Sequence, residues 1–303
     1  QSAADSWRYR VDWHPARLTP VPSRSGRRLL VIPEQVADET TRQWLIDVER
    51  AAGADRRLPV AVEATREELA ARLAAVVAEE SIAEVVSLLA VDERPNSRYP
   101  SVEVGVTATI HLGQALGDAG IDAPLWCVTG GAVTIGGAEA VAHPRQDQVW
   151  GFGRVVALEQ PHRWGGLIDL PPAPTDSELS LLGTVLSSSG EDQIAIRGTT
   201  SYGRRLVAAP RTTRESARMW TPEGTVLVVG GTGGIGAEVA KWPAAEGASD
   251  LVLVGRRGAA AEGASELVED LAAAGARGTI IACDIADREA VTALIGQLDA
   301  AGR

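Results

Sequence analysis

Short apolar runs alternate with longer amphipathic stretches along most of the chain. The first apolar run is residues 29–32, and helical periodicity follows it over 39–52. We expect further strands near 59–62, 85–89, 125–129, 166–170 and 193–196, and further helices near 65–79, 101–118, 146–160 and 176–188. Strands interleaved with helices in this way indicate an α/β unit, in which helices cover both faces of a parallel sheet.

The ends of this first unit show other patterns. Residues 7–13 alternate aromatic or apolar residues with polar ones, which is typical of a half-buried strand at an edge or between domains. A loop that contains three prolines then leads to the first apolar run. We expect the unit to end near Pro210 and the polar, arginine-rich residues 211–221 to form a linker.

The alternation starts again after this predicted linker. Apolar runs at 225–229, 251–254 and 278–283 alternate with predicted helices near 234–246, 261–274 and 287–300. The prediction is therefore two Rossmann-like units with parallel sheets, residues 1–210 and 222–303. Three strands and three helices make half of a nucleotide-binding sheet and leave a strand edge and an apolar face uncovered. We expect the second unit to be incomplete, with its remainder beyond this sequence rather than in another chain.

A glycine-rich segment follows the first strand of the second unit and opens its first helix. It reads Gly230, Gly231, Thr232, Gly233, Gly234, Ile235, Gly236. The glycines at 231, 233 and 236 have the spacing of a dinucleotide fingerprint, which allows a tight turn, close approach to a pyrophosphate and close helix–strand packing. The glycines at 230, 234 and 236 fit the variant spacing of short-chain reductases. The alternative is a strand–helix turn without a ligand, and the flanking strand and helix favour the fingerprint.

Residues at the ends of two further strands indicate which cofactor is bound and how its adenine is held. Arg256 and Arg257 follow the second strand, about twenty residues after the glycines. An NAD site has Asp or Glu there, whereas arginine accommodates the 2′-phosphate of NADP, so we expect NADPH. The alternative is a pair of ordinary surface arginines in an arginine-rich chain. Cys283, Asp284 and Ile285 follow the third strand, where the carboxylate is placed to accept from the adenine amino group or lies solvated in a loop.

Composition excludes several classes of function. The 303 residues are 45% hydrophobic and 23% charged, as in a globular protein of about two domains. A net charge of −11 repels nucleic acid and anionic membranes, and no apolar run approaches the roughly 18 residues that span a bilayer. We expect a cytoplasmic protein that binds neither. Cys127 and Cys283 lie in apolar runs and indicate buried thiols, and the four histidines lack metal-ligand spacing, so no metal is expected.

Seven segments resemble the ketoreductase domains of modular type I polyketide synthases, a branch of the short-chain dehydrogenase/reductases. They are 7–13, 148–159, 163–170, 202–206, 229–236, 251–258 and 282–287. The resemblance implies that residues 1–210 form a cofactor-free structural subdomain and that 222–303 form the amino-terminal half of an NADPH-binding catalytic subdomain. It also implies reduction of a β-ketoacyl chain held on the phosphopantetheine of an acyl carrier protein, with the other synthase domains as partners.

The residues agree with this resemblance at one turn and depart from it at two positions. Residues 32–35, after the first strand, contain no glycine and carry the carboxylate of Glu34, which would repel a pyrophosphate. Val229 stands where the family commonly has Thr. Pro243 lies inside a predicted helix, at a cost of about 3 kcal/mol unless a kink is built in, and this is expected to loosen the cofactor site.

No catalytic residue is expected within the sequence. The resemblance places the active-site Ser, Tyr, Lys and Asn beyond Arg303, and none of the three tyrosines precedes a lysine by four residues, since the single lysine is Lys241. Two alternatives to an active reductase therefore stay open. They are a redox-inactive or epimerase-type scaffold domain and a stand-alone nucleotide-binding regulator.

Overall fold

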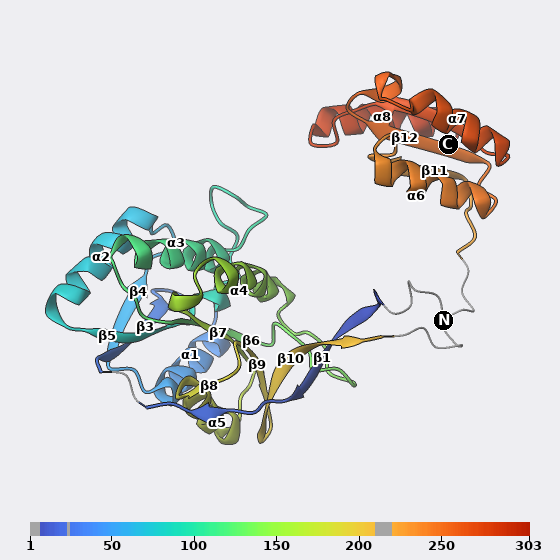
Figure 1. Cartoon of the computed structure of the whole chain (residues 1–303). Coiled ribbons are helices and arrows are strands. Elements are labelled where there is room, and N and C mark those ends of the chain that lie inside the picture. The colour runs from blue at the N-terminus through green and yellow to red at the C-terminus, as the bar shows by residue number, and fades with distance from the viewer. Residues whose placement is uncertain (1–6, 23–24, 210–219) are drawn as a thin grey trace. The chain divides into compact units, whose positions relative to one another are not determined.

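The computed structural model describes residues 7–22, 25–209 and 220–303, and the chain divides into two compact units, Gln1–Pro210 and Arg211–Arg303 (Figure 1). Of the predicted linker, residues 211–219 lie outside the described residues. No described helix combines the length and apolar character needed to cross a membrane.

The first unit is built on an eight-stranded sheet with the order β1-β10-β9-β7-β6-β5-β3-β4. Six strands are mutually parallel: β3 (Arg27–Pro33), β4 (Arg56–Val60), β5 (Ile82–Ser87), β6 (Leu125–Gly130), β7 (Trp164–Leu170) and β9 (Gln193–Arg197). The predicted α/β architecture is therefore confirmed.

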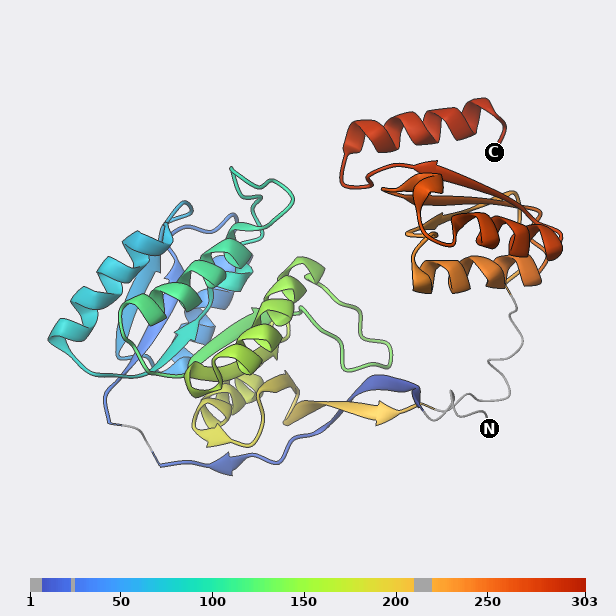
Figure 2. The ribbon, with the colours of Figure 1, turned by 45° about the horizontal axis from the view of Figure 1, so that its top comes forward.

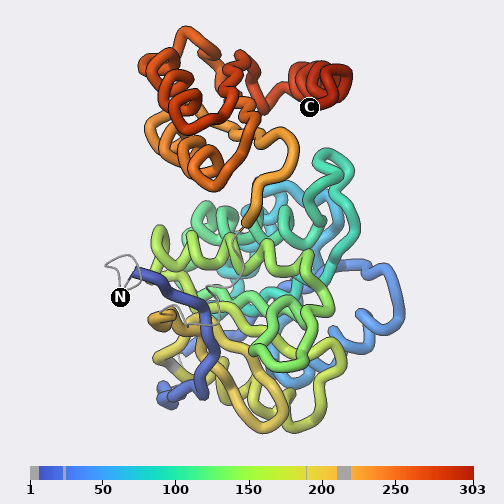
Figure 3. The backbone as a smooth tube through the Cα atoms, turned by 90° about the vertical axis from the view of Figure 1, so that its right-hand side faces the viewer, coloured from blue at the N-terminus to red at the C-terminus, as the bar shows by residue number. Residues whose placement is uncertain are grey.

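The sheet also contains an antiparallel part, which the sequence pattern did not predict in full. Strand β10 (Thr200–Ala208) pairs antiparallel with β9, and β1 (Tyr9–Pro15) pairs antiparallel with β10 at the sheet edge, so the two run side by side (Figure 3). The strand expected at 7–13 thus lies at the sheet edge, whereas β10 was not among the predicted strands, because it exists through its pairing with two neighbours rather than through its own apolar pattern.

Helices cover both faces of this sheet. On one face, α1 (Glu39–Ala52) and α5 (Asp176–Leu186) pack in one hydrophobic cluster. On the other face, α2 (Arg66–Glu79), α3 (Val104–Asp118) and α4 (Asp147–Glu159) pack in a second cluster. Between residues 25 and 209 the unit also has the 3₁₀ turns η2 (Leu89–Val91), η3 (Pro144–Gln146) and η4 (Pro161–Arg163).

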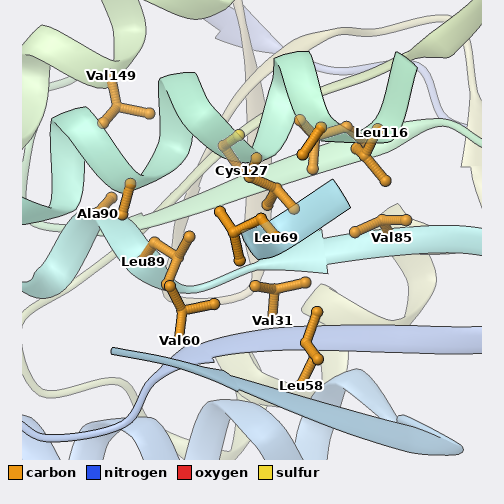
Figure 4. Close-up of a cluster of buried hydrophobic side chains, with 14 of the residues drawn as sticks. Val31, Leu58, Val60, Leu69, Val85, Leu89, Ala90, Leu116, Cys127 and Val149 are labelled. Atoms are coloured by element: carbon orange, nitrogen blue, oxygen red, sulfur yellow. The ribbon is translucent and has the colours of Figure 1, made fainter. Parts of the chain in front are cut away.

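Strand periodicity explains why the two clusters are separate. Leu29 and Val31 of β3 belong to the α2–α3–α4 side, whereas Leu30 and Ile32 belong to the α1–α5 side, because successive side chains of a strand point to opposite faces. Figure 4 shows the cluster on the α2–α3–α4 side, with Cys127 among aliphatic side chains. Burial raises the pKa of the Cys127 thiol to about 12. The prediction that both cysteines are buried free thiols is confirmed.

A segment of residues 16–22 links β1 to β3 and lies along the α5 side of the unit. Its two-residue strand β2 (Thr19–Pro20) pairs antiparallel with β8 (Ser188–Ser189), as Figure 2 shows. The predicted helix near 176–188 thus ends earlier, at Leu186, because the chain turns there to form β8.

The second unit has a three-stranded parallel sheet with the order β11-β12-β13. Its strands are β11 (Thr225–Val229), β12 (Asp250–Gly255) and β13 (Arg277–Ala282); α6 (Gly234–Ala245) and α7 (Ala264–Ala273) lie on one face and α8 (Arg288–Ala300) on the other, with the short turn η6 (Gly258–Ala260). Leu227 and Val229 of β11 are 40% and 51% exposed, which agrees with the expected uncovered face.

Candidate functional site

The glycine-rich segment and two other strand ends meet at the carboxyl edge of the small sheet. The backbone N–H of Gly230 donates to the carbonyl oxygen of Val254 at 2.7 Å, which holds the start of the glycine loop against the end of β12. The N–H of Cys283 donates to the carbonyl oxygen of Gly255 at 3.2 Å. The structure therefore brings residues 230–236, 255–258 and 283–285 together at the edge where open α/β sheets bind ligands.

Glycine is required in this loop for two reasons, which are close packing and a positive φ. A Cβ at Gly236 would lie 1.9 Å from the carbonyl oxygen of Gly230, and one at Gly231 would lie 2.9 Å from Cβ of Leu253, so both positions need glycine for packing. Gly230 adopts a φ of +71°, which favours glycine. A Cβ at Gly234 would meet nothing within 4 Å. That position is open to a ligand.

The first turn of α6 leaves backbone donors without side-chain acceptors. The residue before this helix is Gly233, which has no side chain to cap the helix. The first N–H groups of a helix have no intrahelical partner, and the helix dipole is positive there, so an anion is stabilised at this end. The three segments at this edge therefore fit a dinucleotide diphosphate.

The corresponding helix of the first unit, α1, begins differently. Asp38 caps it, and its Oδ1 accepts from the N–H of Thr41 at 2.8 Å. The backbone hydrogen bond from Thr41 lowers the pKa of Asp38, so the carboxylate stays charged near neutral pH. The Asp38 carboxylate thus occupies the position at the start of α1 where a bound phosphate would lie.

Arg256 and Arg257 are exposed at the end of β12, and neither has an ion pair within the described part of the chain. Lys241 differs, because its Nζ lies 3.3 Å from Glu238 and 3.0 Å from Asp270. The two arginines are therefore free cations beside the glycine loop, and their guanidinium groups suit bidentate binding of a phosphate.

Of residues 283–285, Cys283 packs in the core, whereas Asp284 and Ile285 are exposed. The Cys283 side chain packs with Val252 and Val254 in the core, so any contact of this residue with a cofactor would be made by its backbone. The Asp284 carboxylate is exposed and its Oδ1 accepts from the N–H of Ala286 at 3.1 Å, while Ile285 is 56% exposed. Asp284 and Ile285 therefore remain exposed at this edge of the sheet.

Pro243 lies within α6, but near its far end. The helix continues only to Ala245, and its first turn closes normally, with the N–H of Ala237 donating to the carbonyl oxygen of Gly233 at 2.8 Å. The missing proline N–H affects the last turn, where Pro243 is buried. The glycine end of the helix is intact in spite of this proline.

A polar cluster at the opposite, amino edge of the small sheet was missed by sequence reasoning. Asp250 accepts from Thr225 Oγ1 at 2.6 Å, from Arg277 Nε at 2.8 Å and from Arg303 Nε and Nη2 at 2.8 and 2.7 Å. Burial raises the pKa of Asp250, but the hydrogen bonds from Arg277, Arg303 and Thr225 outweigh burial and hold the pKa well below its usual range. This cluster ties the starts of all three strands together.

No group of three or more His, Cys, Asp or Glu side chains suited to a metal ion occurs among residues 7–22, 25–209 and 220–303. The four histidines have separate surroundings. Among them, His111 Nδ1 lies 3.0 Å from the carbonyl oxygen of Ala64, and His143 Nδ1 lies 2.7 Å from Glu93 Oε1.

Comparison with known proteins gives two family matches that together cover most of the chain. Residues 11–206 match the Rossmann fold domain of polyketide synthase extender module SpnB, and residues 224–303 match the KR domain. Among curated relatives, polyketide synthase GfsA of Streptomyces halstedii is 48% identical over all of this chain and 4% of its own length. PikAIII, a pikromycin synthase component of Streptomyces venezuelae, is 45% identical over 99% of this chain and 18% of its own length.

Solved structures agree with these matches. An A1-type ketoreductase superposes with a TM-score of 0.82 at 43% identity, over 97% of this chain and 62% of the other. A C2-type ketoreductase from a modular polyketide synthase superposes with a TM-score of 0.75 at 41% identity, over 96% of this chain and 62% of the other. The chain thus spans less than two thirds of these proteins. It belongs to the ketoreductase domains of modular polyketide synthases.

Proposed function

We propose that this chain is part of an NADPH-dependent ketoreductase that reduces a β-ketoacyl chain carried on an acyl carrier protein. The family implies a nicotinamide cofactor, and the choice of NADPH is our inference. The observation that carries it is the pair Arg256 and Arg257, free of ion pairs within the described residues and placed beside an uncapped helix start.

Different residues at the carboxyl edge of the small sheet bind different parts of the cofactor. The N–H groups at the start of α6, with Gly233 and Gly234, bind the diphosphate. Arg256 and Arg257 bind the 2′-phosphate, and Asp284 accepts from the adenine amino group. When bound, the cofactor supplies a hydride to the ketone. These residues bind and orient it and do not themselves transfer protons.

The first unit serves as a cofactor-free structural subdomain in this proposal. Support comes from Asp38, whose carboxylate occupies the helix start of α1, and from the turn at residues 32–35, which has no glycine. The relatives are multidomain synthases of which this chain covers a small part, so the other domains of such a synthase are its proposed partners, together with the carrier protein. The similarity to ketoreductases favours a reductase over a redox-inactive scaffold.

The test replaces both arginines by alanine and measures binding of NADPH and NADH by fluorescence titration. A charge-assisted hydrogen bond to phosphate contributes on the order of 1.5–3 kcal/mol, so we expect NADPH to bind at least about tenfold more weakly. NADH lacks the phosphate and is expected to change far less. Adenosine 2′,5′-bisphosphate and 5′-AMP repeat the comparison with fragments that contact this edge alone.

The matched control is Arg98→Ala, which removes an exposed positive charge from a loop of the first unit. It is expected to leave both affinities unchanged. Equal weakening of NADPH and NADH by the double variant would mean that the arginines hold the loop or stack on adenine. An undiminished preference for NADPH would remove them from the site.

A further inference from the structure

A large hollow lies at the amino edge of the first sheet, opposite the edge where α/β proteins usually bind ligands. Its volume is about 670 Å³, and it borders the amino ends of β3, β5, β6 and β7. The 16–22 segment closes one side, since the N–H of Val21 donates to the carbonyl oxygen of Ser187 at 3.1 Å and β2 pairs with β8. The C-terminal ends of α1 and α5 form another side.

The Trp126 indole lines this hollow and has an unused donor. Trp126 is 6% exposed, and its Nε1 has no hydrogen-bond acceptor within the part of the chain that the structure describes. This nitrogen is not sealed in the core, because the one fully enclosed and unpartnered side-chain N or O atom in that part is Nε of Arg163. The indole N–H of Trp126 therefore faces the hollow and suits a ligand that carries an acceptor.

The Trp126 indole occupies space that two glycines leave open. A Cβ at Gly165 would lie 2.7 Å from Trp126 Nε1, and a Cβ at Gly166 would lie 2.7 Å from Cζ3 of the same ring. Both glycines lie on β7, next to Trp126 on β6. Their lack of side chains lets the ring reach the amino edge of the sheet.

The charged residues that line the hollow in the described part of the chain are mostly acidic. They are one arginine and four carboxylates: Arg28, Asp55, Glu84, Glu191 and Asp192. Arg28 is neutralised by Glu84 at 2.6 Å, and Glu191 is paired with Arg205. The C-terminal ends of α1 and α5 add the negative ends of two helix dipoles.

Two carboxylates remain for a ligand. Asp192 is exposed and has no ion pair among the described residues. Within the described residues, the Asp55 carboxylate accepts from the N–H of Arg28 at 2.9 Å and lies 3.4 Å from Nη1 of the exposed Arg27. The backbone hydrogen bond from Arg28 lowers the pKa of Asp55, so this carboxylate is charged at neutral pH.

We propose that this hollow binds an organic cation that also carries a hydrogen-bond acceptor. Its guanidinium or ammonium group pairs with Asp192 and lies against the Trp126 indole ring, which attracts cations. Its acceptor takes the N–H of Trp126. A volume of about 670 Å³ is ordinary for such a ligand. The cation is either a free small molecule or an arginine or lysine side chain of a polypeptide, whose backbone carbonyl is then the acceptor.

The experiment uses the full chain with ¹⁵N in its eight tryptophan indoles, and the Trp126→Phe variant assigns the Trp126 signal. The probe is N-acetyl-arginine amide. We expect a saturable shift of the Trp126 indole signal, and a dissociation constant at least about fivefold higher in Asp192→Asn. The control Asp122→Asn changes a carboxylate that is 76% exposed and lies outside the hollow, and it should leave the dissociation constant unchanged.

A second set of probes distinguishes the two sources of the cation. An acetylated pentapeptide amide with one central arginine that binds at least tenfold more tightly than the single residue would assign the hollow to a polypeptide. Equal affinity would assign it to a small cation. The proposal is overturned if no probe gives a saturable shift, if N-acetyl-glutamate amide shifts the signal equally, or if Asp192→Asn binds the probe as the parent chain does.

Discussion

The cluster around Asp250 allows a quantitative test of what holds the small sheet together. The change is Asp250→Asn, which keeps the size of the side chain and removes its charge. Asp250 and Arg303 are 12% and 16% exposed, whereas Arg277 is 65% exposed. Arg277 regains water when its partner loses charge, so the main loss falls on Arg303.

The expected magnitude follows from this exposure. Removing one partner of a buried pair costs about 3–5 kcal/mol, and the remaining solvent contact of Arg303 reduces that to roughly 2 kcal/mol. The amide oxygen of Asn still accepts from Thr225. In a domain of this size, roughly 2 kcal/mol corresponds to about 8–16 °C in Tm and to about thirtyfold faster hydrogen exchange of the most protected amides.

Hydrogen exchange with mass spectrometry measures this effect separately in each unit. Peptides from β11, β12 and β13 should exchange faster in Asp250→Asn, and those from the first sheet should not change. Glu262→Gln, an exposed carboxylate of the same unit, is the control. Less than threefold acceleration in β12, or equal acceleration in the control, would refute the assigned role.

The dependence on pH has a defined sign. The pKa of Asp250 is lowered in the folded chain, so its contribution is present above the unfolded value of about 3.9 and is lost as pH falls toward the folded value. The difference between Asp250→Asn and the parent chain should therefore be constant from pH 5 to pH 8, about 2 kcal/mol throughout, and should shrink only below about pH 4. A difference that disappears between pH 5 and pH 7 would point to another group.

Two further substitutions test the glycine loop and the buried ion pair of the first unit. Gly236→Ala places a Cβ 1.9 Å from the carbonyl oxygen of Gly230, so we expect a lower Tm and loss of NADPH binding, whereas Gly234→Ala has open space and should leave the Tm unchanged or slightly raised. Arg197→Ala leaves the fully buried Asp169 carboxylate without its cation at 2.7 Å, and urea denaturation should show a loss of about 3–5 kcal/mol. Arg50→Ala, 75% exposed, should cost less than about 1 kcal/mol, and similar losses for the two arginine variants would contradict the role of the pair.

The parallel strands could be predicted because each is an apolar run between helical stretches. Strand β10 could not be predicted from its hydropathy, because Gly203, Arg204 and Arg205 interrupt its apolar residues. One local signal was available. Arg197 pairs with Thr200 across a two-residue loop that starts with Gly198 at φ +59°, and glycine in that position is typical of a tight hairpin.

The candidate site was predictable where its residues are adjacent in sequence. The glycine loop and the Arg256–Arg257 pair follow their strands directly, and the structure places them together. The Asp250 cluster depends on partners 25, 27 and 53 residues away, and no local spacing indicates them. Cys283 follows the third strand by sequence, but the strand's alternation turns its side chain into the core.

The two units differ in the residue that precedes the first helix after the first parallel strand. In the first unit Asp38 caps α1 and lines a hollow of only about 290 Å³ together with Glu93 and His143. A diphosphate there would face two carboxylates and would have to displace a bonded one. In the second unit Gly233 offers no side chain, and the nearest strand end carries two free arginines. A single capping position, carboxylate or glycine, is therefore sufficient reason for our proposal that only the second unit binds the cofactor.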